Sequence, residues 1–336
     1  MTGKSLRNML PHLSTDIESA SIDFSIVIPV YYNQGCLIPA FQMLQEQVFA
    51  HQQGKTYEVI YVNDGSKDHS LEELLKIQAE YPETVRIIDL TRNFGQINAL
   101  MAGFSCTRGD CVIAMSADGQ DPAYIINDML SAHFEEKYDV VICTRKGRDE
   151  SLYRIITSRI FYILIKKLVF PDMPDGGFDF TLMSRRALNV FMRNSKAHFF
   201  YQGQILWMGY KSKFIEYFRN ARIAGTSRWT LAKKITYLID GIMAYSFVPI
   251  RFMSVVGIIL ACLGFLYALL VFSDKLIYGN PIQGWTPLMI VILVLGGFQS
   301  LMLGIIGEYL WRTMAQVQSH DMYVVNHVYE NTQSNR

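Results

Sequence analysis

Five short runs in the first half of the chain are apolar almost throughout, and mixed polar segments separate them. Continuous apolar runs, as opposed to alternating ones, are typical of parallel strands covered on both faces. The polar segment that opens with a capping box at 70–73 has the spacing of an amphipathic helix. Strands that alternate with helices predict a Rossmann-like α/β domain with a mainly parallel sheet. The predicted strands are 24–30, 57–63, 85–90, 111–116 and 139–144.

Two longer apolar runs lie near the C-terminal end of the chain. No residue is charged from Phe252 to Ser273, and none from Pro287 to Gly307. At about 1.5 Å per residue each run is long enough to cross a bilayer, and neither shows the polar stripe of a core helix. We therefore expect two transmembrane helices, at 251–273 and 287–307.

The distribution of basic residues predicts the orientation of these spans. The loop between the spans carries only Asp274 and Lys275, whereas basic residues concentrate on the outer flanks, as the positive-inside rule expects for cytosolic segments. The first residues contain no apolar run and are not expected to be a signal peptide. We therefore predict an inner-membrane protein with its large domain and both termini in the cytosol. The basic flanking residues are Lys233, Lys234, Arg251 and Arg312.

Composition adds two restrictions. The formal net charge is +1, so the charge balance gives no reason to expect a nucleic-acid partner. The five cysteines have no paired C-x-x-C spacing and are expected to be reduced thiols. The expected segments are a loose tail at 1–22, the α/β domain at 23–230, a juxtamembrane helix at 231–250, the spans at 251–273 and 287–307, and a cytosolic tail at 308–336.

Two basic, amphipathic segments precede the first span. The segment 151–170 is apolar and aromatic with interspersed Arg and Lys, which fits either a helix lying in the lipid headgroups or a core helix with solvated lysines. The segment 231–246 has the same character and lies directly before the span, so an interfacial position is favoured there. Together they would hold the α/β domain against the membrane.

Polar clusters follow three of the predicted strands, where the carboxyl ends of neighbouring parallel strands converge. Tyr31 could provide an aromatic wall, Asp64 an acceptor for a nucleotide base, and Asp118 a ligand for a cation beside a diphosphate. The alternative for Asp64-Gly65 is an ordinary β-turn.

The segment SADGQDP, 116–122, contains two acids with different expected duties. Asp121 precedes Pro122 and an apparent helix, so it is expected to be mainly an N-cap. Asp118 has no such local duty and, with the amide oxygen of Gln120 and a diphosphate, would suit a hard divalent ion.

Several motifs in order resemble one enzyme family. SIVIPVYYN, YEVIYVNDGSKD, LTRNFGQINALMAG and SADGQDP resemble the family 2 glycosyltransferases of the GT-A fold, and particularly the polyisoprenyl-phosphate glycosyltransferases. RNARIAGTSRW is similar to that group's R-x-x-G-x-S-K motif, and FDFTLMSRRAL to its G-D-F-R-L segment. The likeness extends from Phe24 to Arg312, including the apolar C-terminal runs.

The resemblance implies a role for each matching position. The nucleotide would contact Pro29, Tyr31, Asp64, Ser116 and Asp118. The metal, Mg²⁺ or Mn²⁺, would be bound by Asp118 and Gln120. The acceptor phosphate would be bound by Arg145, Arg222, Ser227 and Arg228. The catalytic residues would be Asp118, Asp179 and Arg228.

The implied reaction moves a sugar from a nucleotide-diphosphate sugar, expected to be a UDP-sugar, to polyprenyl (undecaprenyl) phosphate. A phosphate monoester is largely ionised near neutral pH, its second pKa being about 6, so the acceptor hardly needs a general base. Asp179 would then orient groups. Arg222 and Arg228 can bind phosphate oxygens in pairs, although positive-inside charge alone is an alternative explanation for them.

The chain departs from the family pattern at several positions, among them Tyr32, which stands in place of the Asn of Y-N-E. Ser116 replaces the first acid of D-x-D-x-Q, which predicts a weaker metal site, and Asn63 replaces the first acid of V-D-D-G-S. Asn33, Phe178 and Thr181 also differ from the usual residues, so the sugar is not assumed to be glucose. The rival functions are a processive polysaccharide synthase, whose Q-x-x-R-W glutamine is missing here, and a membrane scaffold that has lost catalysis.

The tail 321–331 contains a strand-like run. Such a strand could pair with the sheet edge of a neighbouring subunit. This predicts a homo-oligomer, with a tetramer as the form that the resemblance suggests.

Overall fold

The structure is a computed structural model, which describes most of the α/β domain and two long helices. The predicted segments at 1–22, 151–170 and 231–250 lie wholly or largely outside the described residues, as do Arg222 and Arg228. The described residues are 22–146, 163, 165–167, 169–174, 177–195, 200–220, 241–242, 245–246, 248–278, 285–317 and 321–331.

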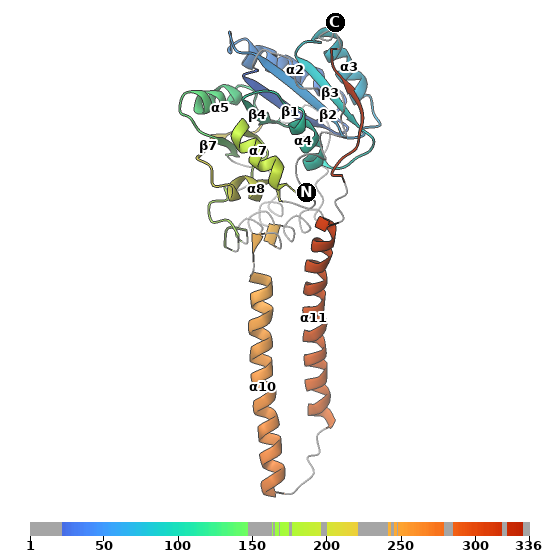
Figure 1. Ribbon diagram of the computed structural model, residues 1–336, viewed down its shortest axis with the longest axis vertical. Helices are drawn as coiled ribbons and strands as arrows, with labels where there is room; N and C mark the ends of the chain where they lie inside the picture. Colours follow the sequence, from blue (N-terminus) through green and yellow to red (C-terminus); the bar gives the residue numbers. More distant parts are fainter. Residues whose placement is uncertain are drawn as a thin grey trace.

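The domain is built on one eight-stranded sheet with the order β7-β5-β6-β4-β1-β2-β3-β8 (Figure 1). All five strands predicted from apolar runs form, and four of them, β4, β1, β2 and β3, are consecutive neighbours in the sheet. The strands are β1 (Phe24–Val30), β2 (Tyr57–Asn63), β3 (Val85–Leu90), β4 (Cys111–Ala114), β5 (Val140–Arg145), β6 (Thr181–Ser184), β7 (Ser212–Tyr217) and β8 (Val325–Tyr329).

The predicted mainly parallel sheet is confirmed. The pairs β1–β2, β1–β4, β2–β3 and β5–β7 are parallel, whereas β6 runs antiparallel between β4 and β5, and β8 antiparallel to β3. β6 and β7 were not predicted, because TLMS has polar residues at both ends and SKFIEY mixes charged and apolar residues, so neither shows the apolar run of the other strands.

Helices cover both faces of the sheet, which explains the unbroken apolar strands. Ile26 and Ile28 of β1 face one core and Val27 faces the other, and all three are buried. Apolar residues of α2, α3 and α5 fill the first core, and those of α4, α7 and α8 the second. The helices are α2 (Leu37–Leu44), which continues into the π-helical turn η1 (Gln45–Phe49), α3 (Ser70–Glu80), α4 (Gln96–Ser105), α5 (Ile125–Phe134), α7 (Arg185–Asn194) and α8 (Tyr201–Trp207).

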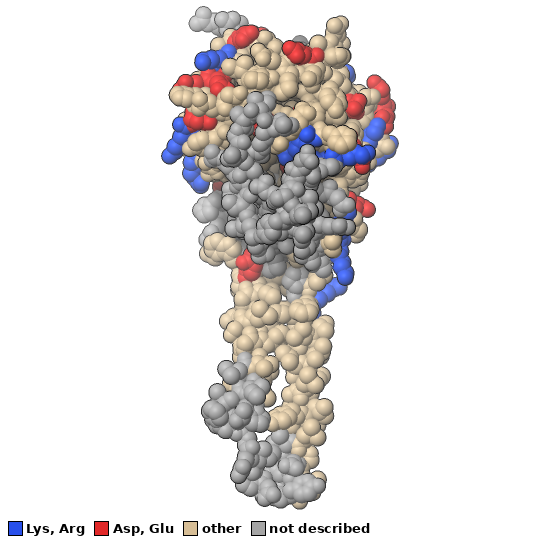
Figure 2. Space-filling model, turned by 180° about the vertical axis from the view of Figure 1, so that it is seen from behind, with Lys and Arg blue, Asp and Glu red and all other residues tan. Residues whose placement is uncertain are grey.

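Two long helices, α10 (Val248–Tyr278) and α11 (Trp285–Val317), extend side by side away from the domain (Figure 1). Figure 2 shows the described surface of the two helices as uncharged along most of their length, with charged residues on the domain and near it. Among the described residues, only Ile250–Tyr267, with a mean hydropathy of 2.1, is long and apolar enough to count as a membrane-crossing segment. The second span, at 287–307, stays a prediction.

The chain returns from α11 to the domain and forms β8, beside β3 (Figure 1). Ile87 pairs with Tyr329 and Ile88 with Val328 in an antiparallel ladder. The predicted strand in 321–331 therefore forms, and it pairs with β3, at the edge of its own sheet. The prediction of a homo-oligomer loses this support and stays a prediction.

Candidate functional site

The polar clusters predicted after β1, β2 and β4 lie at one edge of the sheet, because these strands are parallel neighbours. Val30 and Asn63 are paired in the β1–β2 ladder, and the amide of Asp64 donates to the carbonyl of Val30 at 2.8 Å. The amide of Met115 donates to the carbonyl of Val27 at 3.1 Å, which places Ser116 beside the end of β1. Pro29, near the end of β1, lies beside Val62. We call this the carboxyl edge.

Asp64 does more than form a local turn. Its carboxylate accepts the backbone N–H groups of Phe94 at 2.6 Å and Gly95 at 2.9 Å, from the loop after β3. Burial raises the pKa of Asp64, although these two amides and the charge of Arg92 act in the opposite direction. Gly65 is required here, because its φ is +64° and an added Cβ would lie 2.5 Å from the backbone of Arg92.

The loop that carries Tyr31 is held against the next strand–helix connection through its backbone. Four consecutive amides, from Tyr32 to Gly35, donate to side chains, and the Oδ1 of Asn33 accepts the amide of Tyr31 at 2.9 Å. The loop is thus fixed beside the Asp64 turn. The four acceptors, in order, are Ser66 at 3.1 Å, Ser70 at 2.9 Å, Asp68 at 3.3 Å and Glu73 at 2.7 Å.

Ser70 is therefore not the cap that the predicted capping box requires. It is the first residue of α3, and His69, at the N-cap position, makes no side-chain cap bond; the amide of Ser70 donates to the Oδ1 of Asp68 at 3.2 Å. The hydroxyl of Ser70 accepts the amide of Asn33, and the carboxylate of Glu73 accepts that of Gly35. Both side chains bind the β1–α2 loop and not their own helix, because that loop brings backbone amides close to them.

Asn63, one of the departures from the family pattern, has a buried acidic neighbour. Its Nδ2 donates to the Oδ1 of Asp89 at 2.7 Å, and its Oδ1 accepts the amide of Ser66 at 3.3 Å. Asn63 and Asp89 are paired across β2 and β3. An acid at position 63 would face the carboxylate of Asp89, so the amide suits this pairing. Sequence reasoning missed Asp89, although an acid at the end of the run VRIIDL was a signal.

Ser116 lies between two carboxylates. Its hydroxyl is 3.0 Å from the Oδ1 of Asp118 and 2.5 Å from the Oδ2 of Asp121, and its single hydrogen serves one of them at a time. The backbone amide of Ser116 donates to the same oxygen of Asp121 at 3.1 Å, and that of Gln120 to Asp118 at 3.2 Å. The residue that replaces the expected acid thus holds the other two acids together.

Asp121 is not the cap of the following helix, contrary to the sequence prediction. α5 begins at Ile125 with Tyr124 as its N-cap residue, and no side chain caps it. A turn after Asp121, in which the amide of Ile125 donates to the carbonyl of Pro122, separates it from the helix. Its Oδ1 instead accepts the hydroxyl of Tyr217, at the end of β7, at 2.7 Å.

Arg145 connects Tyr217 to Asp179. Its guanidinium donates to the Oδ2 of Asp179 at 2.7 Å, and Arg145 and Tyr217 are paired across β5 and β7. Burial opposes the charge of Arg145, but Asp179, Tyr217 and Asp121 outweigh it and raise its pKa, so it stays charged. Burial, and then Asp121, raise the pKa of Tyr217, which keeps the phenol protonated.

A continuous polar chain therefore connects two of the predicted catalytic residues. It runs from Asp118 through Ser116, Asp121, Tyr217 and Arg145 to Asp179. Sequence reasoning singled out neither Tyr217 nor this role of Asp121, because the contact depends on the position of β7.

The two remaining departures, Phe178 and Thr181, are core residues. Both are fully or almost fully buried, and the Oγ1 of Thr181 lies 2.8 Å from the hydroxyl of Tyr201. The backbone carbonyl of Phe178 accepts the side-chain amide of Gln202 at 2.8 Å. These substitutions therefore alter the packing beneath Asp179.

The oxygen atoms of this edge suit a hard divalent cation only in part. Asp118 and Asp121 provide carboxylates, and the Nε2 of Gln120 donates to the carbonyl of Asn220 at 3.3 Å. No group of three or more His, Cys, Asp or Glu side chains that could hold a metal exists within the described ranges. Such a donor set fits Mg²⁺ or Mn²⁺ if substrate phosphates complete the coordination, because these ions share oxygen ligands between protein and phosphate. Arg222, Ser227 and Arg228 lie outside the described residues.

Comparison with known proteins gives consistent results. The profile of the family "Glycosyl transferase family 2" matches residues 25–191. The chain is 34% identical to the uncharacterized glycosyltransferase YkcC of Bacillus subtilis, over 93% of this chain and 95% of that protein. It is 33% identical to the SfII prophage-derived bactoprenol glucosyl transferase of Shigella flexneri, over 90% of this chain and 96% of that protein.

Among solved structures, the chain is similar to the mannosyltransferase PcManGT of Pyrobaculum calidifontis, with a TM-score of 0.48 and 16% identity over 67% of this chain and 64% of that one. The sequence relatives span nearly the whole of both chains, and they decide the assignment. The Rossmann-like sheet, the matched profile and these relatives agree, and the chain belongs to glycosyl transferase family 2 as a glycosyltransferase.

Proposed function

We propose that this glycosyltransferase moves a sugar from a nucleotide-diphosphate sugar, a UDP-sugar, to a polyprenyl phosphate in the membrane. The observation that carries the proposal is a glycosyltransferase domain joined in one chain to an apolar helix of membrane-crossing length. A lipid acceptor cannot leave the bilayer, so an enzyme that uses it must work at the bilayer surface. The bactoprenol glucosyl transferases, similar over 90% of this chain, support this acceptor class.

The carboxyl edge would bind the donor. Asp64 would accept a hydrogen bond from the nucleotide base, and Pro29 and Tyr31 would form the adjoining wall. Asp118 and Gln120, with Ser116 as the residue that orients Asp118, would hold Mg²⁺ or Mn²⁺ together with the diphosphate. When bound, the ion supplies positive charge for the leaving diphosphate.

The polar chain would connect donor and acceptor. Arg145 stays charged and would face phosphate oxygens while Asp179 fixes its position, a role that needs no proton transfer. Because the acceptor phosphate is largely ionised near neutral pH, no side chain has to abstract a proton from it. Arg222, Ser227 and Arg228 would bind that phosphate, since guanidinium groups remain charged and can bind two oxygens.

The proposed topology has two spans, α10 and the 287–307 part of α11, in the inner membrane. The α/β domain and both termini would lie in the cytosol. Two observations support this arrangement: the helices extend in the same direction from the domain, and β8 after α11 packs on the domain (Figure 1).

The test is transfer by the full-length protein in vesicles that contain undecaprenyl phosphate, with a panel of nucleotide sugars and with Mg²⁺, Mn²⁺ or a chelator. We expect a glycolipid from at least one UDP-sugar, lost with the chelator. Asp118→Ala should lower turnover by about 10²-fold or more, as the loss of one transition-state contact does. Asp128→Ala, an exposed acid on α5, is the matched control and should keep normal turnover. No product and no nucleotide binding would favour a scaffold, and normal turnover in Asp118→Ala would remove Asp118 from the site.

A further inference from the structure

β8 is the last strand of the part of the chain that the structure describes, and it is attached to β3 at both of its ends. At one end Glu330 contacts Arg86, and at the other Asn326 contacts Asp89. Arg86 lies near the start of β3 and Asp89 near its end. The strand that follows the long helices is therefore bonded to β3 near both ends of that strand, one of which lies at the carboxyl edge.

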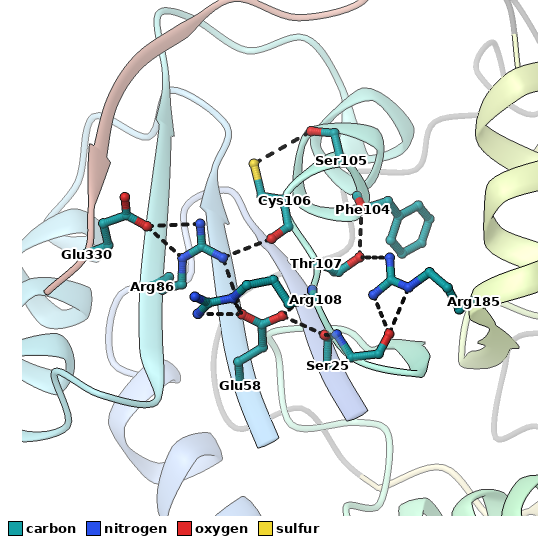
Figure 3. A network of polar contacts seen from close by, with 11 residues as sticks. Ser25, Glu58, Arg86, Phe104, Ser105, Cys106, Thr107, Arg108, Arg185 and Glu330 are labelled. Atoms are coloured by element: carbon teal, nitrogen blue, oxygen red, sulfur yellow. Dashed lines mark hydrogen bonds and ion pairs between the residues drawn. The ribbon is translucent and has the colours of Figure 1, made fainter. Parts of the chain in front are cut away.

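The attachment at the opposite ends of the parallel strands, which we call the amino edge, is part of an ionic network centred on buried Glu58 (Figure 3). Arg86 lies 3.0 Å from Glu330 and 3.2 Å from Glu58, which is almost fully buried and also contacts Arg108 at 3.1 Å. In the backbone ladder Asp89 pairs with His327, with an irregularity between Asp89 and Leu90, and Asn326 reaches Asp89 through its side chain.

The attachment at the carboxyl edge leads to the predicted nucleotide site. The Nδ2 of Asn326 donates to the Oδ2 of Asp89 at 2.8 Å, while the Nδ2 of Asn63 donates to the Oδ1 at 2.7 Å. Asn63 in turn accepts the amide of Ser66, and Ser66 accepts that of Tyr32. One amide on each oxygen of a buried carboxylate thus connects β8 to the two loops that carry Asp64 and Tyr31.

We propose that Asn326 is a positioning residue for nucleotide binding, which it orders through Asp89 and Asn63. This inference rests on the proposed function for the identity of the ligand. Without Asn326, one oxygen of buried Asp89 loses its donor, which costs free energy and lets the carboxylate turn away from Asn63. The Ser66 turn and the Tyr32 loop then lose a fixed partner.

The other side-chain contacts around β8 provide a matched control. Asn331 donates to Glu83 at 2.5 Å, near the opposite end of the strand and away from the carboxyl edge. Asn331→Ala removes an amide from the same segment as Asn326→Ala does. A general loss of strand attachment would affect both variants alike. The proposed relay, which is the series of contacts from Asn326 through Asp89 and Asn63, makes Asn326→Ala the more harmful variant for nucleotide binding.

The charge pattern permits a sharper test. Asn326→Asp places two carboxylates together and should be worse than Asn326→Ala. The double variant Asn326→Asp with Asp89→Asn reverses donor and acceptor: the new amide at 89 accepts from Asn63 and donates to the new acid at 326. It keeps the net charge of the wild type and should restore binding, including where Asn326→Asp alone folds poorly.

The measurements are the donor KM and kcat of each variant and amide hydrogen exchange without substrate. We expect Asn326→Ala to raise KM about three- to tenfold, the loss of one hydrogen bond, with kcat changed less than about twofold. Exchange should become faster at residues 64–66 and 31–33 in Asn326→Ala but not in Asn331→Ala, and the double variant should restore both readouts.

The outcomes separate the two proposals. If the wild type binds no nucleotide, the proposed function fails, and hydrogen exchange alone then decides the relay. If Asn326→Ala matches Asn331→Ala in exchange and KM, or if the double variant restores neither, the relay is overturned while the proposed function stands.

Discussion

The two edges of the central sheet both contain buried polar side chains, but they pair them differently. At the amino edge, Glu58 contacts Arg86 and Arg108, and the guanidinium of Arg185 donates to the carbonyl of Gly109 (Figure 3). Opposite charges face each other there. At the carboxyl edge the bonds to the acids come mostly from neutral donors, which are hydroxyl groups and amides of the backbone or of asparagine.

This difference indicates what each edge does. Paired charges in a closed network leave little for a ligand to neutralise, so the amino edge serves the fold. Acids held by neutral donors keep their negative charge available to a cation or to a hydrogen-bond donor of a ligand, and such groups concentrate at functional sites. The comparison predicts that substitutions at the amino edge change stability and that those at the carboxyl edge change activity.

The largest effect is expected from Glu58→Ala. It removes the buried acidic partner of Arg86, which keeps the half-exposed Glu330, and breaking a buried ion pair costs up to about 3–5 kcal/mol. The thermal unfolding midpoint in detergent should fall clearly, while the folded fraction keeps its turnover. Glu72→Ala, at an exposed position on α3, should change stability by less than about 0.5 kcal/mol. Lost turnover at unchanged stability would contradict the comparison.

The next largest effect is expected from Tyr217→Phe. It removes the hydroxyl that holds Asp121, and outer groups of this kind are typically worth about 10–100-fold in activity. Turnover should fall within that range while the unfolding midpoint changes little. Tyr138→Phe, just before the start of β5 and so near the amino edge, is the control. Equal turnover in both variants would show that the polar chain has no part in the reaction.

Ser116→Asp tests the metal directly. Without metal, a third carboxylate beside Asp118 and Asp121 should destabilise the protein by about 1–2 kcal/mol, the size of one pKa unit or slightly more. Mn²⁺ should reverse this loss and raise the unfolding midpoint more than it does in the wild type. Ser116→Ala, which adds no charge, should show no larger Mn²⁺ response than the wild type. An unchanged response in Ser116→Asp would place the ion elsewhere.

The smallest effect concerns the pH dependence of nucleotide binding. Burial raises the pKa of Asp64 above its ordinary value of 3.8, so Asp64 becomes protonated at a higher pH than an exposed aspartate. The ionised carboxylate destabilises the folded state, and this destabilisation disappears as the pH falls through the raised pKa and Asp64 becomes protonated. Nucleotide affinity should therefore fall, by less than about tenfold, as the pH is lowered from 7 towards the raised pKa of Asp64. Asp64→Asn should bind more weakly at pH 7 and lose this pH dependence, which calorimetric titration would show.

Local patterns predicted the sheet well because burial on both faces leaves a direct mark on sequence. The runs of β1 to β5 are apolar for that reason, and Asp64 and Asp118 follow strands whose ends must converge. The same local reasoning failed at Asp121 and Ser70. Each has the residue type of a helix cap, but a partner distant in sequence, Tyr217 or Asn33, takes its side chain.

The sequence by itself therefore determined the α/β class, the parallel centre of the sheet, the apolar helix and the family. Three features were decided by the tertiary structure alone. β8 pairs with β3 of its own chain, Asn63 donates a hydrogen bond to Asp89, and a chain of polar contacts connects Asp118 to Asp179. The physical reason is range: strand burial and turn chemistry depend on near neighbours, whereas a hydrogen-bond partner depends on the register of strands far apart in the chain.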